Sequence, residues 1–101
     1  MNQENFWQQF PHVCSRVSTR QVDSDKVVLN LKSGNFVTLN EVAAYLWDTI
    51  DGRSNMQAIL EKLVREYAVD EQTAREDLSE IVAELLEENV IELRNQPGEQ
   101  I

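Results

Sequence analysis

His12 and Cys14 are the one pair of residues whose types could support nucleophilic chemistry. The sequence holds one cysteine and one histidine, and on a strand this spacing places both side chains on the same face. A thiol activated by an imidazole base also needs an orienting group and donors for an oxyanion, and no neighbouring residue supplies either. We therefore interpret the pair as a half-buried thiol near an exposed imidazole, and we expect no catalytic residue and no enzymatic activity.

The residues that usually hold metals and phosphates are too few or too scattered to form a site. One cysteine and one histidine fall short of the four ligands of a structural zinc site. The glycines at positions 34, 52 and 98 are isolated in turns or near the C-terminus, so the chain has no glycine-rich phosphate loop. We expect neither a metal nor a cofactor.

The chain is strongly acidic, and its charge is unevenly distributed. Its 101 residues carry 18 acidic and 9 basic side chains, a net charge of −9. Residues 1–53 hold 6 acidic and 5 basic side chains, whereas residues 54–101 hold 12 and 4. This field opposes partners that are bound by neutralising phosphates, so we expect neither nucleic acid nor an anionic membrane as a partner.

Cysteine content and hydropathy indicate the compartment. A lone cysteine forms no internal disulfide. Residues 1–10 contain no basic side chain and no apolar run of signal-peptide length, and no segment approaches about 20 apolar residues. We therefore expect a cytoplasmic protein without a membrane-spanning segment.

Apolar and polar residues alternate between Val13 and Leu39, which predicts strands. The alternation is clearest over residues 26–31. One face there carries Val27, Leu29 and Leu31, and the other carries Val28 and Asn30. Gly34 and Asn35 supply the positive φ angles of a tight turn, after which residues 36–39 fold back as a third strand.

From Asn40 onward apolar residues recur at helical spacing and predict three helices. Asn40 caps the first, Ser54 or Asn55 caps the second, and Asp70 caps a third helix with an acidic exposed face. Residues 90–93 form a short final strand. The order predicts an α+β fold, a three-stranded antiparallel sheet followed by three helices, which is the outline of a winged helix-turn-helix.

The same pattern predicts the domain organisation. We expect an N-terminal segment over residues 1–12, one domain over residues 13–93 and a disordered tail over residues 94–101. The N-terminal segment holds Phe6, Trp7 and Phe10, three of the seven aromatic residues. These side chains cap the core, dock on a partner or mediate a homodimer, and the sequence leaves all three open.

The strand from Asn35 to Leu39 is a candidate binding element. If it lies at the edge of the sheet, its free N–H and C=O groups are a template on which an extended peptide can add as a further strand. Alternatively, the chain's own N-terminal segment covers this edge. DNA binding is disfavoured, because the third helix offers Arg75 as its one basic side chain among many carboxylates.

The sequence from residue 13 to residue 93 resembles the PqqD-like family, small domains that recognise ribosomally made precursor peptides. No single motif carries this resemblance; the order and spacing of many residues do. They are Val28-Leu29-Asn30-Leu31-Lys32-Ser33-Gly34, Leu39-Asn40, Ala43, Trp47, Asp51-Gly52, Ile59, Leu63, Tyr67-Ala68-Val69-Asp70, Asp77, Leu85 and Val90-Ile91.

The resemblance implies a non-enzymatic peptide chaperone of winged helix-turn-helix fold. Such a protein binds the leader of a precursor peptide and presents it to a separate maturation enzyme, a radical SAM enzyme, a protease or a cyclase. In the family the leader adds to the third strand and lies in a groove walled by the third helix. The residues at the matching positions are Phe36, Val37 and Thr38 for the backbone ladder, and Asp77, Ile81 and Glu84 for the groove.

The acidic third helix then favours a leader that carries Lys or Arg. The chain departs from the members that serve coenzyme PQQ synthesis, which often have a cysteine where Ile50 precedes Asp51. It resembles more closely the stand-alone members of other peptide pathways, such as those of lasso or radical-SAM-modified peptides. The alternatives are a winged-helix transcription regulator and a protein–protein adaptor.

Overall fold

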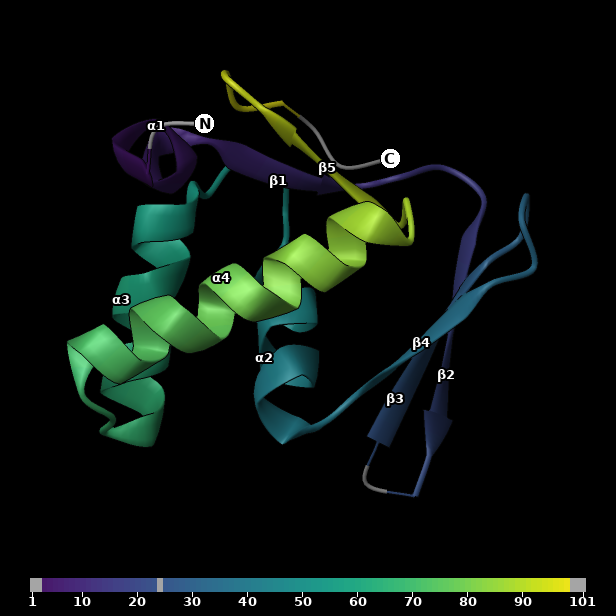
Figure 1. Cartoon of the computed structure of the whole chain (residues 1–101), viewed down its shortest axis with the longest axis horizontal. Helices are drawn as coiled ribbons and strands as arrows, with labels where there is room; N and C mark the ends of the chain where they lie inside the picture. Colours follow the sequence, from purple (N-terminus) through teal and green to yellow (C-terminus); the bar gives the residue numbers. More distant parts are fainter. Residues whose placement is uncertain (1–2, 24, 99–101) are drawn as a thin grey trace.

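The computed structural model describes residues 3–23 and 25–98 of the chain (Figure 1). The elements follow in the order α1 Gln3–Gln8, β1 Phe10–Val13, β2 Val17–Val22, β3 Asp25–Asn30, β4 Phe36–Leu39, α2 Glu41–Thr49, α3 Met56–Tyr67, α4 Glu71–Glu87 and β5 Ile91–Arg94. The expected α+β fold, an antiparallel sheet followed by three helices, is confirmed.

The strands form two separate antiparallel sheets. Strands β2, β3 and β4 pair in that order, and β1 pairs with β5 in a second, two-stranded sheet. Val13 and Val17, which both belong to the alternating pattern of the sequence, therefore lie in different strands, β1 and β2. Arg16, with φ of 63°, turns the chain between them.

The turn between β3 and β4 differs in one detail from the sequence prediction. Gly34 adopts the expected positive φ of 84°, but Asn35 does not share it. Asn35 instead begins the β3–β4 ladder, because its carbonyl oxygen accepts from the Asn30 N–H at 2.8 Å.

The side chain of Asn30 ties this turn to the end of α4. Its Oδ1 accepts from the N–H groups of Lys32 and Ser33 at 2.9 and 3.1 Å. Its Nδ2 donates to the carbonyl oxygen of Glu88 at 3.1 Å and to that of Asn89 at 3.3 Å. Asn30 is buried, and these four bonds pair both polar atoms of its side chain.

One face of the three-stranded sheet joins the helices in a single core. Val28, Val37 and Leu39 are buried on this face, against Leu46 of α2 and Leu85 of α4 among others. The alternate residues of the same strands lie on the opposite face. In Figure 1 all of α2, α3 and α4 lie to one side of this sheet.

The three helices begin at side-chain caps. Asn40, Asn55 and Asp70 each accept a hydrogen bond from the N–H three residues later, at 2.9, 2.9 and 3.0 Å. Asn55, and not Ser54, is thus the cap of α3. No helix among the described residues is both long and apolar enough to cross a membrane.

The described residues of the N-terminal segment pack on the helices and do not pair with β4. Phe6 and Trp7 meet edge to face with centroids 4.9 Å apart, and both pack against the core. The Arg75 guanidinium lies 4.8 Å above the Trp7 ring. These aromatic side chains cap the core; their roles toward a partner or in a homodimer stay predictions.

Contacts cross both expected domain boundaries. Gln9 donates to Asn95 at 3.2 Å, and the Gly98 N–H donates to the carbonyl oxygen of Gly52 at 2.9 Å. Residues 99–101 of the expected tail lie outside the described residues. The boundaries at residues 13 and 93 stay a prediction.

We expect Gly52→Ala to destabilise the fold more than Gly34→Ala does. Both glycines have a positive φ, but a Cβ at Gly52 would lie 2.5 Å from the Gly98 oxygen and 2.9 Å from His12 Nε2, whereas Gly34 faces open space. The free energy of unfolding in urea should fall by about 1 kcal/mol for Gly34→Ala and by at least about 1 kcal/mol more for Gly52→Ala. Equal losses of unfolding free energy in the two variants would show that the residues around Gly52 accommodate the added methyl group without an energetic penalty.

Candidate functional site

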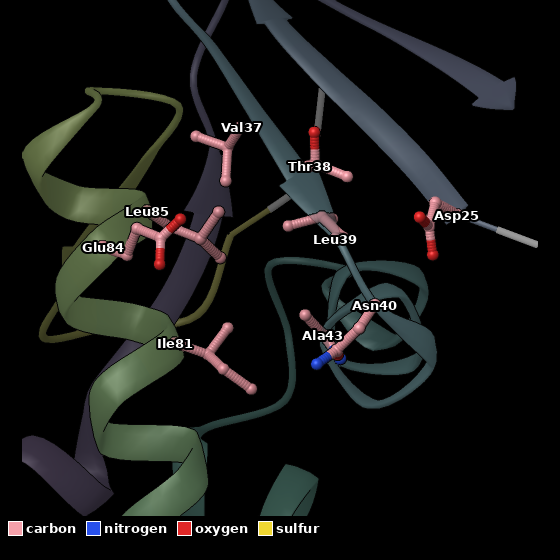
Figure 2. Close-up of a pocket in the computed structure, with 9 residues that line it drawn as sticks. All are labelled: Asp25, Val37, Thr38, Leu39, Asn40, Ala43, Ile81, Glu84 and Leu85. Atoms are coloured by element: carbon pink, nitrogen blue, oxygen red, sulfur yellow. The ribbon is translucent and has the colours of Figure 1, made fainter.

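A groove lies between strand β4 and helix α4. It contains a pocket of about 200 Å³. The pocket is lined by Asp25, Val37, Thr38, Leu39, Asn40, Ala43, Ile81, Glu84 and Leu85 (Figure 2). The groove thus joins residues from β3, β4, α2 and α4 that are far apart in the sequence.

The floor of the pocket is apolar. Val37 and Leu39 alternate along β4 and are buried, and Figure 2 shows both side chains directed toward α4. Ile81 and Leu85 face them from α4, one helical turn apart. Ile81 is half-buried, so the floor still has apolar surface open to a ligand.

Two carboxylates stand at the rim. Glu84 is exposed on α4, and Asp25 is exposed at the start of β3. Figure 2 places the two on opposite sides of β4, and none of the described residues that line the pocket is basic. The rim therefore favours a cationic group over an anionic one.

The backbone of β4 presents a free edge to this groove. Within the described chain no strand pairs with the side of β4 opposite β3, and Figure 2 shows α4 across that side. Hydrogen-bonded pairs alternate along an antiparallel ladder, and Asn30 with Asn35 is one such pair. The register then assigns Val37 and Leu39 to bonds with β3.

Consequently, Phe36 and Thr38 direct their N–H and C=O groups away from β3, toward the free edge. The predicted ladder of Phe36, Val37 and Thr38 therefore needs a correction. Val37 contributes a side chain to the pocket floor, while its backbone polar groups serve the sheet.

The structure brings five of the eight predicted site residues together at the pocket. These are Val37, Thr38, Leu39, Ile81 and Glu84. Phe36 lies on β4 but lines a different depression, and Asn35 lies at the turn. Asp77, an exposed residue one turn before Ile81, does not line the pocket.

Four lining residues were not among the predicted ones. Leu85 follows Ile81 at helical spacing, so the sequence indicates that the two share one face of the helix. A buried position on that face is equally typical of an ordinary core residue. Asn40 was identified as a helix cap and among the residues that carry the family resemblance, and not as a site residue. Asp25 and Ala43 reach the pocket through the strand register and the packing of α2, for which the sequence has no local signal.

His12 and Cys14 form no nucleophilic site. The expected exposed imidazole is wrong: His12 is 1% exposed, its Nδ1 lies 3.0 Å from the Phe10 carbonyl oxygen, and its Nε2 meets no partner among the described residues. Cys14 lies beyond the end of β1. Burial raises the pKa of its thiol, and the Glu92 carboxylate adds to the rise, which disfavours the reactive thiolate.

Residues 3–23 and 25–98 contain no group of three or more His, Cys, Asp or Glu side chains that could hold a metal ion. The chemistry that this part of the chain offers is therefore that of the groove: backbone hydrogen bonds, an apolar pocket and a carboxylate rim.

Comparisons with known proteins identify relatives of the chain. The family model described as coenzyme PQQ synthesis protein D (PqqD) matches residues 25–91, about two thirds of the chain. No curated protein matches the sequence.

Two solved structures share the fold. One is described as TbiB1 in complex with the TbiA(beta) leader peptide, with a TM-score of 0.72 and 23% identity, over 80% of this chain and 94% of that one. The other is lasso peptide synthetase B1 complexed with the leader peptide, with a TM-score of 0.65 and 23% identity, over 81% and 96%.

The direction of the β4 backbone groups gives a stability test. Val37→Pro removes an N–H that bonds to β3 and alters a buried side chain, so we expect it to lower the free energy of unfolding by about 2–4 kcal/mol. Thr38→Pro removes an N–H that faces the free edge and should cost about 1 kcal/mol or less. Urea unfolding followed by circular dichroism measures both. A larger loss for Thr38→Pro would reverse the assignment.

Proposed function

Because the chain belongs to the PqqD family, we propose that it is a peptide-binding module that captures the leader of a ribosomally made precursor peptide by strand addition. The observation that carries this proposal is the free edge of β4 beside the pocket on α4. The shared fold of two proteins described as leader-peptide complexes supports it. Residues 13–93 would form the recognition domain.

In this proposal the leader lies between β4 and α4 as a fourth strand of the sheet. The backbone groups of Phe36 and Thr38 hold it, and each hydrogen bond contributes about 1 kcal/mol net. Side chains of a strand point alternately to its two faces, so every second leader side chain faces the helices. An apolar one enters the pocket between Leu39 and Ile81.

Affinity and selectivity then come from different parts of the groove. The backbone ladder accepts almost any sequence, because every residue except proline offers the same groups. The pocket selects for an apolar side chain, and the carboxylates of Glu84 and Asp25 favour Lys or Arg beside it. The leader we expect therefore combines an aliphatic or aromatic residue with a basic neighbour.

The module acts without catalysis of its own. It would hold the leader while a separate maturation enzyme, a radical SAM enzyme, a protease or a cyclase, modifies the rest of the precursor. The nature of the groove supports this division, since its backbone groups, apolar floor and carboxylate rim are suited to holding a peptide. The pathway we favour is one of the peptide pathways other than coenzyme PQQ synthesis.

A winged-helix transcription regulator receives no support from the positions of the basic groups. Arg75, the one basic residue of α4, lies over Trp7 and bonds to Glu71 at 3.3 Å and to Gln57 at 3.4 Å. It is thereby held against the protein rather than presented to a DNA groove.

Thr38→Pro tests strand addition. Loss of one edge donor should weaken binding of the precursor leader by about five- to tenfold, as expected for about 1–1.4 kcal/mol. Thr19→Pro is the matched control, because Thr19 is exposed on the opposite edge strand β2 and its N–H also points away from β3. Isothermal titration with a synthetic leader measures both variants. Equal affinities in two folded variants would exclude β4 as the added strand's partner.

Charge reversal at the rim tests the preference for basic leaders. Glu84→Lys should lower affinity for a Lys-containing leader by about tenfold at low salt, with a smaller effect at high salt because ions screen the pair. Asp77→Lys introduces the same charge one turn beyond the pocket and should have a weaker effect. Identical affinities of the two variants, or a loss that salt does not change, would contradict a role for the rim.

A further inference from the structure

Exposed apolar side chains concentrate on the three-stranded sheet. Among the described residues four large hydrophobic side chains are exposed, and three belong to the β2–β4 region: Val22 at 46%, Leu31 at 53% and Phe36 at 64%. A cluster of this kind on a monomer is typical of an interaction surface.

The strand register gathers these side chains on one face. Ser18, Leu29 and Phe36 lie opposite one another across the three strands, as do Arg20, Val27 and Thr38. A shallow depression of about 310 Å³ is lined by Ser18, Arg20, Val27, Leu29 and Phe36. We define these five residues, together with Val22, Asp25, Leu31 and Thr38, as the outer face of the sheet.

The described part of the chain leaves the outer face open. The helices α2, α3 and α4 lie on the other side of the sheet, where Val28 and Val37 join the core. The N-terminal segment packs on α3, and β1 pairs with β5 away from this sheet (Figure 1).

The charge of the sheet differs from that of the rest of the chain. Residues 13–40 carry 4 basic and 2 acidic side chains, a net charge of +2, whereas the remaining residues carry 5 basic and 16 acidic, a net charge of −11. Arg20 lies in the depression itself. Asp25 lies at the end of the same face, opposite Val22, but it is not among the residues that line the depression. A partner with an apolar patch bordered by carboxylates therefore meets attraction at the depression and repulsion at the helices.

The outer face is continuous with the proposed leader site. Phe36 and Thr38 direct their backbone groups toward the free edge, while their side chains lie on the outer face. A leader strand added to β4 would extend this face by one strand. A protein docked there would contact both the module and its bound leader.

These observations point to one occupant. We propose that the outer face docks the maturation enzyme, through an apolar patch of the enzyme flanked by Asp or Glu side chains; this rests on the proposed function. A second copy of this chain is the alternative occupant of an apolar face, and the oligomeric state measured below distinguishes it from the enzyme. Nucleic acid fits less well, because phosphates do not need an exposed apolar centre.

The test uses the full-length chain and, as the probe, the modifying enzyme encoded beside the chain's own gene. Arg20→Glu and Leu31→Ser change the outer face and leave the groove intact. Arg65→Glu and Val69→Ser are matched controls at exposed positions on α3 and just after it. Each variant is titrated with the enzyme and, separately, with the leader, and its oligomeric state is measured by analytical ultracentrifugation.

We expect each outer-face variant to bind the enzyme at least about tenfold more weakly, with leader affinity unchanged, and each control to match the parent protein. Enzyme affinity that is the same in outer-face variants and controls overturns the docking site, as does an enzyme that does not bind the parent protein. A dimer that Leu31→Ser dissociates, with enzyme affinity unaltered, assigns the face to a second copy and also overturns it.

The two proposals fail separately. A parent protein that binds the enzyme through the outer face but does not bind the leader retains the docking site and refutes the leader-binding function. A parent protein that binds the leader, with outer-face variants that bind the enzyme as tightly as the parent does, retains the leader-binding function and refutes the docking site.

Discussion

The buried amide of Asn30 is the constraint on which the groove depends. One end of this side chain accepts hydrogen bonds from the β3–β4 turn, and the other donates to the carbonyls of the two residues that follow α4. The groove lies between the strand that follows the turn and the helix that ends just before those carbonyls. The distance between its two walls is therefore fixed by a residue that does not line it. A buried amide has all its hydrogen-bond partners only when the turn and the end of α4 lie in this one arrangement, and losing them costs free energy. Asn30 therefore specifies the relative position of the turn and the helix as well as stabilising it.

Local signals in the sequence were sufficient for most elements. Asn40 and Asp70 cap helices because a short polar side chain can reach an N–H three residues on, and Gly34 marks the turn because its φ is positive. The pairing of β1 with β5 joins residues about 80 positions apart, and no local pattern encodes it. The burial of His12 also has no local signal, because Gly52 and Gly98 approach this residue through long-range packing.

The site was predictable in outline and not in detail. The spacing of Ile81 and Leu85 indicates a helix face, and the run 36–39 indicates a strand. The strand register then decides which face of this strand, and which edge of the sheet, is left open to a ligand. A shift of one residue would exchange the roles of Val37 and Thr38. The resemblance to a family supplied the neighbourhood of β4 and α4, whereas the direction of each backbone group required the hydrogen bond between Asn30 and Asn35.

The Glu84 carboxylate beside the free edge has a consequence for the protein in isolation. An unpaired strand with apolar neighbours is a template for pairing with a second copy of itself, the route to edge-to-edge aggregation. Two copies that met along β4 would bring the Glu84 carboxylates of the two chains toward each other, at the cost of like-charge repulsion. Glu84 thus disfavours pairing of two copies along β4, whereas a leader that carries Lys or Arg would meet attraction at the same place.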